Sequence, residues 1–481
     1  MRLHDTMTGD IVEFESQRPP IVTMYVCGVT VYDSPHVGHA RSAVAFDVLR
    51  RYLEYRGYDV IFAKNFTDID DRMIERANER GITIGQLGRQ YIDEYEDAMA
   101  ALNVKPPIYA PRATNLIPDM ITFIQRLEDS GHAYNVNGNV YFDVDSVENY
   151  GRLSRKPAEE IEDINRRDSE EFADEKRNPR DFALWKRQKE GEPAWESPWG
   201  PGRPGWHIEC SVMSTKLLGE TIDIHGGGLD LVFPHHENEI AQSEAASGKQ
   251  FCRYWVHNGF VTINKEKMSK SLHNFFTISE VLAEYEAPAL RMFLISAQYR
   301  SPLNFDKDQL DQATKNWHRI RDAWRAGFGA VGAEHVVSEW TPVPRETLDA
   351  GILEALDEFE AAMDEDLNTP RAIAAVFTAA KIVNELAATG AEASILEPAF
   401  LAYRRMIAVL GFDIGYLKAN AQPKAAAGEQ LDALVQKFIE ERAEARKAKD
   451  FAKADEIRDY LTSIGIELAD SKDDTTWKLA E

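Results

Sequence analysis

The chain has 481 residues, with 80 acidic against 55 basic side chains, and its net charge is −25 at pH 7. At roughly 150 residues per domain this length predicts about three domains, and 44% hydrophobic residues exclude wholesale disorder. The acidity argues against a protein that coats nucleic acid nonspecifically, because that requires many cations on phosphates. Three cysteines are too few for a disulfide framework. With no signal peptide and no apolar run of about 18 residues, we expect a cytoplasmic protein and no membrane partner.

The first 70 residues have the pattern of an α/β domain. Residues 21–32 are apolar and β-branched, which predicts a buried strand. A turn-like segment with proline and glycine follows at 33–39, and apolar residues then recur at helical spacing over 42–56. Residues 58–63 predict a second strand. Ligands of doubly wound α/β domains bind at the carboxyl ends of the strands, so we expect the turn at 33–39 to border a site.

The rest of the chain indicates a second α/β segment, a helical region and a small charged end. Residues 156–177 are densely charged and predict a solvated insertion. The further elements expected, in chain order, are a strand at 221–224, a glycine turn at 226–228, a helix from Pro234 to Ala246, a strand at 254–263, helices from about 309 onward, a linker at 414–430 and a charged module at 431–481.

Two histidines flank a glycine before the first predicted helix, as His36-Val37-Gly38-His39. A helix N-terminus offers free N–H groups and a partial positive charge, and glycine allows a phosphate to approach closely. Imidazoles can donate hydrogen bonds to phosphate oxygens whose charge grows in a transition state. The pattern favours a phosphate site, although two histidines in a turn also occur on ordinary surfaces.

A cationic segment, Lys265-Glu266-Lys267-Met268-Ser269-Lys270-Ser271, follows the strand predicted at 254–263. A polar loop with several ammonium groups can close over a polyphosphate, and a solvated charged loop is the alternative. Together, in one α/β frame, the two-histidine turn and this segment resemble the signature pair of the class I aminoacyl-tRNA synthetases. Those enzymes activate an amino acid with ATP and transfer it to tRNA.

A third set of side chains has the chemistry of a metal site. Cys27 lies towards the end of the first strand, Cys210 lies far along the chain, and His235 and Glu239 stand four residues apart on one helix face. His236 has an isoleucine four residues on, so we expect it to be less suited to that face. Two thiolates, an imidazole and a carboxylate suit zinc. Buried free cysteines beside a solvated helix end are the alternative.

Four longer segments look like the cysteinyl-tRNA synthetase family, and the similarity runs over nearly the whole chain. They are 25–33, 65–71, 205–211 and 225–239. The resemblance implies an α/β fold: a Rossmann-type class I synthetase catalytic domain with an insertion, then a helical domain and a small C-terminal anticodon-binding module. The implied boundaries are 1–125 and 201–260 for the two catalytic halves, 126–200 for the inserted connective domain, 261–308 for the signature-loop and stem-contact region, 309–420 for the helical bundle and 431–481 for the module.

The resemblance also implies a role for individual residues. The implied catalytic residues are His36, His39, Lys267 and Lys270, and the ATP-binding residues are Gly38, Gly226, Gly228, Asp230 and Lys270. The implied substrate-binding residues are Gly28, Thr67, Trp206 and His225; the zinc ligands are Cys27, Cys210, His235 and Glu239; the anticodon-reading residues are Arg446, Asp455 and Asp470. One zinc ion per chain is the expected cofactor, and ATP with Mg²⁺ is an expected substrate.

The implied function is ATP-dependent attachment of L-cysteine to tRNA(Cys) through a cysteinyl-adenylate, in a monomer, with zinc selecting the substrate thiolate. One alternative is the cysteine ligase of mycothiol synthesis, which shares the catalytic fold but needs no anticodon module. The other is a noncatalytic tRNA-binding or zinc-sensing relative, against which the intact signature residues argue. Residues 287–325, with seven bases against four acids, are the expected tRNA surface together with the C-terminal module.

Overall fold

A computed structural model describes most of the chain, namely residues 1–156, 160, 174–263, 266–267, 275–332 and 342–412, and in the C-terminal part 435, 437–439, 442–443, 445–447, 450–463, 466–470 and 475–479. The chain divides into two compact units, 1–413 and 414–481, at the start of the predicted linker. Lys270 and most of the charged stretch 156–177 lie outside the described residues.

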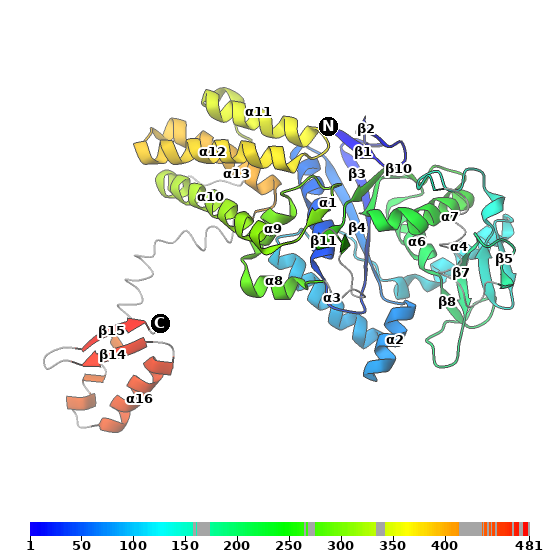
Figure 1. The fold of residues 1–481 in the computed structure, drawn as a ribbon, viewed down its shortest axis with the longest axis horizontal. Coiled ribbons are helices and arrows are strands. Elements are labelled where there is room, and N and C mark those ends of the chain that lie inside the picture. Colours follow the sequence, from blue (N-terminus) through cyan, green and yellow to red (C-terminus); the bar gives the residue numbers. More distant parts are fainter. Residues whose placement is uncertain are drawn as a thin grey trace. The chain divides into compact units, whose positions relative to one another are not determined.

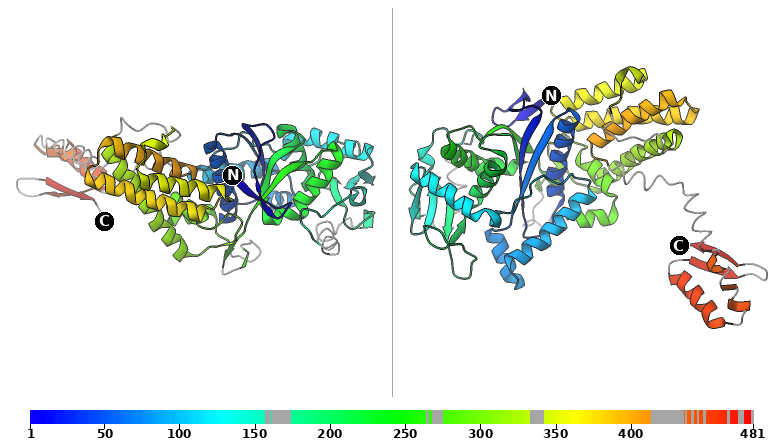
Figure 2. Two further views of the ribbon diagram at one scale, coloured as in Figure 1. Left: turned by 90° about the horizontal axis from the view of Figure 1, so that it is seen from above. Right: turned by 180° about the vertical axis from the view of Figure 1, so that it is seen from behind.

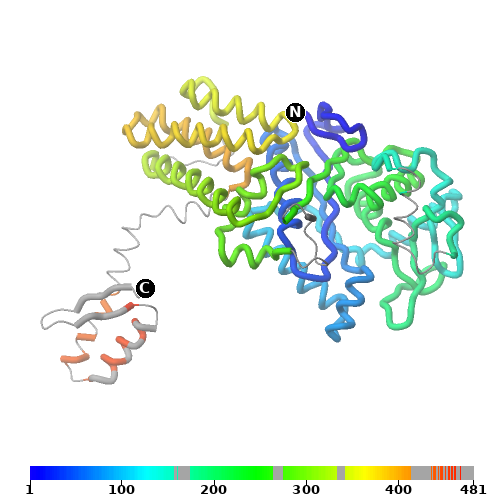
Figure 3. The backbone as a smooth tube through the Cα atoms, in the orientation of Figure 1, coloured from blue at the N-terminus to red at the C-terminus, as the bar shows by residue number. Residues whose placement is uncertain are grey.

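A four-stranded parallel sheet forms the centre of the first unit (Figure 1). Its strand order is β10 (Cys252–Asn258), β9 (Ile222–Gly228), β3 (Ile21–Thr30) and β4 (Asp59–Thr67). Figure 3 shows that the early strands in blue and the later strands in green lie side by side, so the sheet joins two distant parts of the sequence. Because the strand order reverses between β3 and β9, the crevice at their carboxyl ends is the expected place for a ligand.

Helix α1 (Val37–Tyr55) connects β3 to β4 and buries the face that the sequence predicted. That face consists of Val44, Val48, Leu49, Tyr52 and Leu53, each at most 1% exposed. The helix begins earlier than predicted because His36 caps it, and β4 also runs further than predicted, to Thr67. Both differences bring ordered backbone closer to the carboxyl edge of the sheet.

The prediction of a turn at 226–228 was wrong. These glycines end strand β9 and pair with Val256, His257 and Asn258 of β10. A Cβ atom added to Gly226 would lie 2.3 Å from Cε1 of Phe46 on α1, so the glycine permits close packing of helix on strand. The single strand predicted at 254–263 is two strands, β10 and β11 (Val261–Ile263).

The inserted segment forms a second, antiparallel sheet (Figure 2). It contains β5 (Ala133–Val136), β6 (Asn139–Phe142), β7 (Phe182–Arg187) and β8 (Gly202–Pro204). Helix α6 (Trp206–Leu218) packs on β7 of this sheet and on β3 and β4 of the parallel sheet, beside α4 (Ile117–Asp129). Helix α6 therefore links the inserted sheet to the parallel sheet.

Helices predominate after residue 307, as predicted. They are α10 (Lys307–Val331), α11 (Ala350–Asp364), α12 (Thr369–Thr389) and α13 (Ala393–Val409), which pack side by side in Figures 1 and 2. Helix α12 is long and apolar enough to cross a membrane by length and composition alone. Its contacts with α10, α11 and α13 account for that apolar character as a face of the helical bundle.

A buried ionic cluster ties α1 to the end of the bundle. Asp47 of α1 pairs with Arg51 (Nε–Oδ2 2.7 Å) and with Arg291 of α9 (Ala287–Leu294). Arg291 also donates from Nε to the carbonyl oxygen of Leu410, at the end of α13, over 2.7 Å. Burial would raise the pKa of Asp47, but the charges of Arg291 and Arg51 outweigh it and lower that pKa.

The second unit has a small core of its own. Helix α16 (Phe451–Ser463) lies beside the hairpin of β14 (Ile466–Asp470) and β15 (Thr475–Leu479). The core residues are Val435, Ile439, Ile457, Leu461 and Ile466. Arg446 and Asp455, predicted to read the anticodon, are exposed, while the side chain of Asp470 lies outside what the structure describes.

Candidate active site and metal centre

The two signature histidines form the first turn of α1. His36 is the N-cap: its Nδ1 accepts a hydrogen bond from the N–H of Gly38 over 3.1 Å, and its own N–H donates to Nδ1 of His39 over 3.2 Å. The two rings stack with centroids 3.7 Å apart. This reciprocal cap fixes both imidazoles at the positive end of the helix, where an anionic phosphate is stabilised.

The four predicted metal ligands come together from four elements. Cys27 lies in β3, Cys210 in α6, His235 in the π-helical turn Val232–His236 and Glu239 in the first turn of α7 (Glu237–Ser247). One ligand atom from each lies within 4.8 Å of the others, and all four residues are buried. Two thiols, an imidazole and a carboxylate at this spacing suit a zinc ion, so the residues fit the metal that the sequence predicted.

The electrostatics of this set favour partial ionisation before any metal binds. Burial would raise the pKa of Cys210, but the hydrogen bond of Cys27 and the charge of His235 outweigh it and hold that pKa at about 6. Burial and the neighbouring Cys210 raise the pKa of Cys27. Burial would lower the pKa of His235, yet Glu239 and Cys210 raise it to about 10. Against the effect of burial, His225 and His235 lower the pKa of Glu239 to about 2.

His236, which helical spacing made less suited to the ligand face, also lies beside the cluster. Its Nε2 lies 3.3 Å from Sγ of Cys27, and its Nδ1 lies 2.7 Å from Nε2 of His257. Cys27, His225, His236 and Glu239 form a second group whose ligand atoms also lie within 4.8 Å of one another. His235 and His236 stand four and three residues before Glu239, so both can approach it: their Nε2 atoms lie 3.0 and 3.9 Å from Oε1 of Glu239.

One cavity of about 320 Å³ joins the signature turn to the metal set. It is lined by Cys27 and by the predicted residues Gly28, His36, Gly38, His39, Trp206, Gly228 and Asp230. The other predicted pocket residues, Thr67, His225 and Gly226, are buried and do not line it. The signature turn and Cys27 of the metal set therefore border a single cavity.

Trp206 also lines a neighbouring polar cavity, together with Glu209, a carboxyl that sequence reasoning missed. Glu209 is 1% exposed, and its Oε2 accepts a hydrogen bond from Oγ1 of Thr67 over 2.9 Å. Burial raises the pKa of Glu209 well above its ordinary value, and the charge of Cys210 adds to that effect. The sequence indicates Glu209 as a site residue only through its position between Trp206 and Cys210, in the first turn of α6.

Gly28 is required for a different reason from substrate contact. Its N–H donates to Oδ1 of Asn65 over 2.8 Å, and a Cβ atom there would lie 1.6 Å from the carbonyl oxygen of Asn65. The strands β3 and β4 approach too closely at this point for any side chain, beside the irregularity between Val26 and Val29.

The lysine segment is only partly described. Lys267 belongs to the short strand β12 (Glu266–Lys267), which pairs with β11, whose first residue, Val261, lines the 320 Å³ cavity. The side chain of Lys267 and the whole of Lys270 lie outside the described residues.

The basic stretch 287–325 is mostly engaged in ion pairs. Five of its seven bases have acidic partners, namely Arg291 with Asp47, Arg300 with Asp366, Lys307 with Glu284, Arg321 with Glu286 and Arg325 with Asp322. Local excess of positive charge in the sequence therefore does not amount to a row of unpaired cations on the surface.

Comparisons with known proteins agree with this geometry. Residues 13–315 match the family model of the tRNA synthetases class I (C) catalytic domain, residues 358–414 match the DALR domain, and residues 429–477 match the cysteinyl-tRNA ligase anticodon binding domain. A protein of Geobacter sulfurreducens named cysteine–tRNA ligase is 49% identical over 100% of this chain and 99% of its own. The chain belongs to the cysteine–tRNA ligase family. A ligase of the same name from Symbiobacterium thermophilum is 46% identical over 100% of both chains.

Solved structures show the fold of this ligase at low sequence identity. Mycobacterium tuberculosis methionyl-tRNA synthetase in complex with methionyl-adenylate has a TM-score of 0.58 and 15% identity, covering 81% of this chain and 88% of its own. The LeuRS of Agrobacterium radiobacter K84, solved as a ternary complex, has a TM-score of 0.58 and 12% identity, covering 83% and 85%. The predicted class I synthetase fold is confirmed.

Proposed function

We propose that this ligase activates L-cysteine with ATP, transfers it to tRNA(Cys) and selects the substrate thiol with a zinc ion. In the first step the cysteine carboxylate attacks the α-phosphorus of ATP, a P–O bond forms, and pyrophosphate leaves. In the second step a terminal ribose hydroxyl of tRNA attacks the carbonyl carbon of the adenylate, and AMP leaves. The observation that carries the proposal is that Cys27 lines the same cavity as His36 and His39.

The capped first turn of α1 provides the phosphate site. Charge builds on the phosphate oxygens as the carboxylate attacks, and the imidazoles of His36 and His39 stand at a helix N-terminus where that charge is favourable. Because the two rings are held by each other and by the backbone, they need no reorganisation when the charge develops. Lys267 and Lys270 are proposed to neutralise the departing pyrophosphate.

Cysteine must be distinguished from serine, which differs only by oxygen in place of sulfur. A hydrophobic pocket gives little discrimination for so small a change. Cys27, Cys210, His235 and Glu239 would hold a zinc ion, and this Lewis acid would favour a thiolate over a hydroxyl. The wall residues of the cavity position the amino acid for that choice, with Trp206, Gly228 and Asp230 proposed to contact substrate or nucleotide.

The C-terminal unit distinguishes this proposal from the ligase of mycothiol synthesis. Residues 429–477 match an anticodon binding domain, which an enzyme acting on an amino sugar does not need. Within this domain, Arg446, Asp455 and Asp470 are proposed to read anticodon bases. The noncatalytic alternative conflicts with an intact signature turn that is joined to the metal set by one cavity.

The decisive experiment combines three assays on the purified, zinc-loaded full chain. Cysteine-dependent exchange between ATP and pyrophosphate measures activation, with serine as the competing amino acid. Charging of tRNA(Cys) measures transfer, with glucosaminyl-inositol as the alternative acceptor. Zinc content is measured for the wild type and for Cys210→Ser.

We expect exchange with cysteine but not serine, charging of tRNA(Cys), and a joint loss of zinc and cysteine affinity in Cys210→Ser. Transfer to glucosaminyl-inositol but never to tRNA would contradict the acceptor. Absence of exchange in metal-replete protein would favour the noncatalytic relative. Normal activation by a zinc-free variant would contradict the proposed selection of the thiol.

A further inference from the structure

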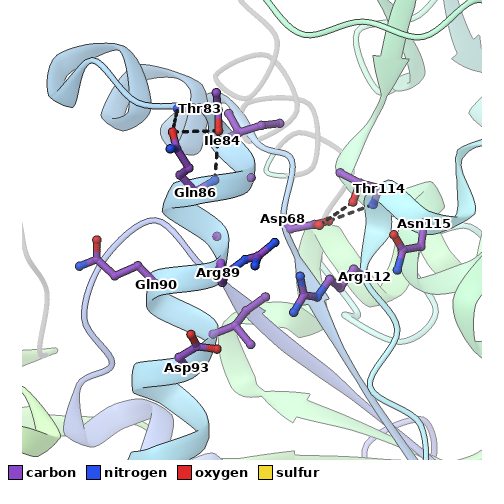
Figure 4. Close-up of a pocket in the computed structure, with 13 residues that line it drawn as sticks. Asp68, Thr83, Ile84, Gln86, Arg89, Gln90, Asp93, Arg112, Thr114 and Asn115 are labelled. Atoms are coloured by element: carbon purple, nitrogen blue, oxygen red, sulfur yellow. Dashed lines mark hydrogen bonds between the residues drawn. The ribbon is translucent and has the colours of Figure 1, made fainter.

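A second large cavity, of about 720 Å³, lies outside the catalytic cavity and has no role in the chemistry described above. Figure 4 shows its two walls: one is the start of α3 (Ile84–Ala101), and the other is the segment 112–115 that follows the central sheet. The side chains of Arg89, from α3, and Arg112, from the opposite wall, extend toward one another across it.

The two arginines carry charge that the protein does not neutralise. Among the described residues, neither guanidinium takes part in a hydrogen bond or an ion pair. Asp93 stands one helical turn after Arg89 and also lines the cavity, yet it makes no ion pair with that arginine. The chain has a net charge of −25, and many arginines of this unit have acidic partners, as Arg51, Arg203, Arg291 and Arg300 do, whereas these two face one another across a cavity without one.

Asp68 is a carboxylate that lines the cavity, and it already accepts hydrogen bonds from the protein. Asp68 accepts hydrogen bonds from the N–H and the Oγ1 of Thr114, over 2.9 and 2.6 Å. These bonds, with the N–H of Phe66 donating to the carbonyl oxygen of Pro111 over 2.9 Å, fix the segment carrying Arg112 to the end of β4. Arg112 is therefore presented on ordered backbone, and Arg89 on a capped helix.

The cavity lies at the same carboxyl edge of the sheet as the catalytic site. Asp68 directly follows β4 and lines it, and Ile69, Asp70 and Asp71 line the neighbouring polar cavity that contains Trp206. Arg72 lines both that polar cavity and the 320 Å³ catalytic cavity. A single stretch of five residues thus borders all three cavities in succession.

We propose that Arg89 and Arg112 clamp a backbone phosphate of the acceptor strand of tRNA, close to the 3′ end that must enter the catalytic cavity. The inference rests on the proposed function. A planar guanidinium can donate two parallel N–H bonds to two phosphate oxygens. Two guanidinium groups that face one another can therefore bind one phosphodiester from both sides. The contact fixes the position of the strand without reading its sequence.

The test uses the full chain with Arg89→Gln, Arg112→Gln and the double variant. Arg126→Gln is the matched control, because Arg126 is an exposed arginine of α4 whose Nη1 lies 3.9 Å from Oε1 of Glu220. Binding of tRNA(Cys) and of an RNA containing only its acceptor arm is measured over a series of salt concentrations. Cysteine-dependent exchange between ATP and pyrophosphate is measured in the same preparations.

The double variant should weaken binding of both RNAs about tenfold, the loss expected when charge-assisted hydrogen bonds disappear. The slope of log affinity against log salt should fall by about 0.7–0.9 for the one phosphate released. Exchange should stay within about twofold of the wild type, because that reaction needs no tRNA. Arg126→Gln should leave both RNA affinity and slope unchanged.

An unchanged affinity in the double variant would overturn the site, as would an equal loss in Arg126→Gln, which would indicate a general effect of charge. A loss of exchange together with binding would assign the cavity to ATP instead. If Arg112→Gln lowers the melting temperature, Arg89→Gln alone decides, since Arg89 is exposed on its helix. Failure of the wild type to charge tRNA would contradict the proposed function, whereas normal charging with unchanged binding contradicts only this site.

Discussion

The Nε2 atom of His236 lies 3.3 Å from Sγ of Cys27 and its Nδ1 lies 2.7 Å from His257, whose own Nδ1 is 2.8 Å from Oγ1 of Thr6. Burial lowers the pKa of His236 well below its ordinary value and that of His257 to about 3, so both rings are neutral at pH 7. A neutral imidazole has one donor and one acceptor, so each hydrogen bond along this chain fixes the tautomer of the next ring.

Breaking this chain at its outer end should therefore weaken zinc binding without removing a ligand. Thr6→Val is expected to lower zinc affinity about tenfold, and His236→Asn by up to about 100-fold, as for other partners that orient metal ligands. Thr6→Ser should restore wild-type affinity. Competition with a chromogenic chelator measures the affinities, and equal values for Thr6→Val and wild type would contradict the orienting role.

Zinc binding should release protons, because zinc ligands must be deprotonated. At pH 7–8 the Cys210 thiol, with a pKa of about 6, has largely lost its proton, whereas His235, with a pKa of about 10, and Cys27, whose pKa is raised, still carry theirs. We expect release of about two protons per zinc and a log affinity that rises by about two per pH unit. Below pH 6 Cys210 adds a third proton, so acid weakens binding more steeply.

Calorimetry in buffers of different ionisation enthalpy counts these protons. Glu239→Gln is the informative control, because Glu239 is one of the groups that raise the pKa of His235. That variant should release fewer protons than the wild type at pH 8. Metal uptake with no proton release would contradict the charge states assigned to the site.

The two functions of His36, capping and catalysis, should separate in two variants. His36→Asn keeps a side chain that caps helices well, whereas His36→Ala loses the cap and about 1 kcal/mol of stability. Both variants lose the imidazole at the phosphate site, so both should slow ATP–pyrophosphate exchange about 100-fold. Urea unfolding and exchange rates measure the two effects, and wild-type exchange in His36→Asn would remove His36 from the chemistry.

Asp47→Asn should be strongly destabilising, because it leaves Arg291 and Arg51 buried without their counter-charge. A cost of about 3–5 kcal/mol in unfolding free energy is typical of such a loss. Since the pKa of Asp47 is lowered in the fold, its contribution is complete above its unfolded pKa of about 3.9 and is lost as pH falls through the folded value.

Denaturant unfolding from pH 7 to pH 3 tests this dependence. Glu358→Gln is the control, since Glu358 forms an exposed pair with Arg371 and its loss should leave the unfolding free energy unchanged. If wild type and Asp47→Asn lose stability in parallel as the pH falls, Asp47 is not the group that titrates.

Gly28→Ala should distort the pairing of β3 with β4, because the new Cβ would meet the backbone carbonyl of Asn65, which has no alternative rotamer. We expect a loss of about 3 kcal/mol. Gly329→Ala, in α10 with no atom within 4 Å of the added Cβ, should instead stabilise the protein by up to about 1 kcal/mol. Thermal unfolding compares the two, and a stable Gly28→Ala would show that the strands can separate.

Local patterns in the sequence predict much of the site. His235 and Glu239 were paired by helical spacing, and the structure places their Nε2 and Oε1 atoms 3.0 Å apart. The signature turn was recognised because its residues are contiguous. The buried face of α1 followed from its periodicity, since α1 packs on one side only.

Features that depend on tertiary approach could not be predicted in the same way. The glycine run at 226–228 has the composition of a turn, and only its pairing with β10 and the proximity of Phe46 make it a strand. The position of His236 depends on its contacts with Cys27 and His257, which belong to two other segments of the chain. Arg89 and Arg112 come from separate segments and face one another only across the folded cavity, where Asp68 holds Thr114 near Arg112.

Helix α1 holds the signature histidines in its first turn and the buried Asp47 two turns later, about 12 Å further along its axis at 1.5 Å per residue. Arg291, on α9, and the carbonyl of Leu410, at the end of the bundle, are bonded in the same cluster. The bundle therefore cannot rotate at this end independently of α1. If α9 and α13 moved away from the sheet, either Asp47 would lose its buried partner Arg291 or α1 would move with them. A displacement of α9 or α13 would therefore be transmitted along α1 to its first turn, the proposed phosphate site.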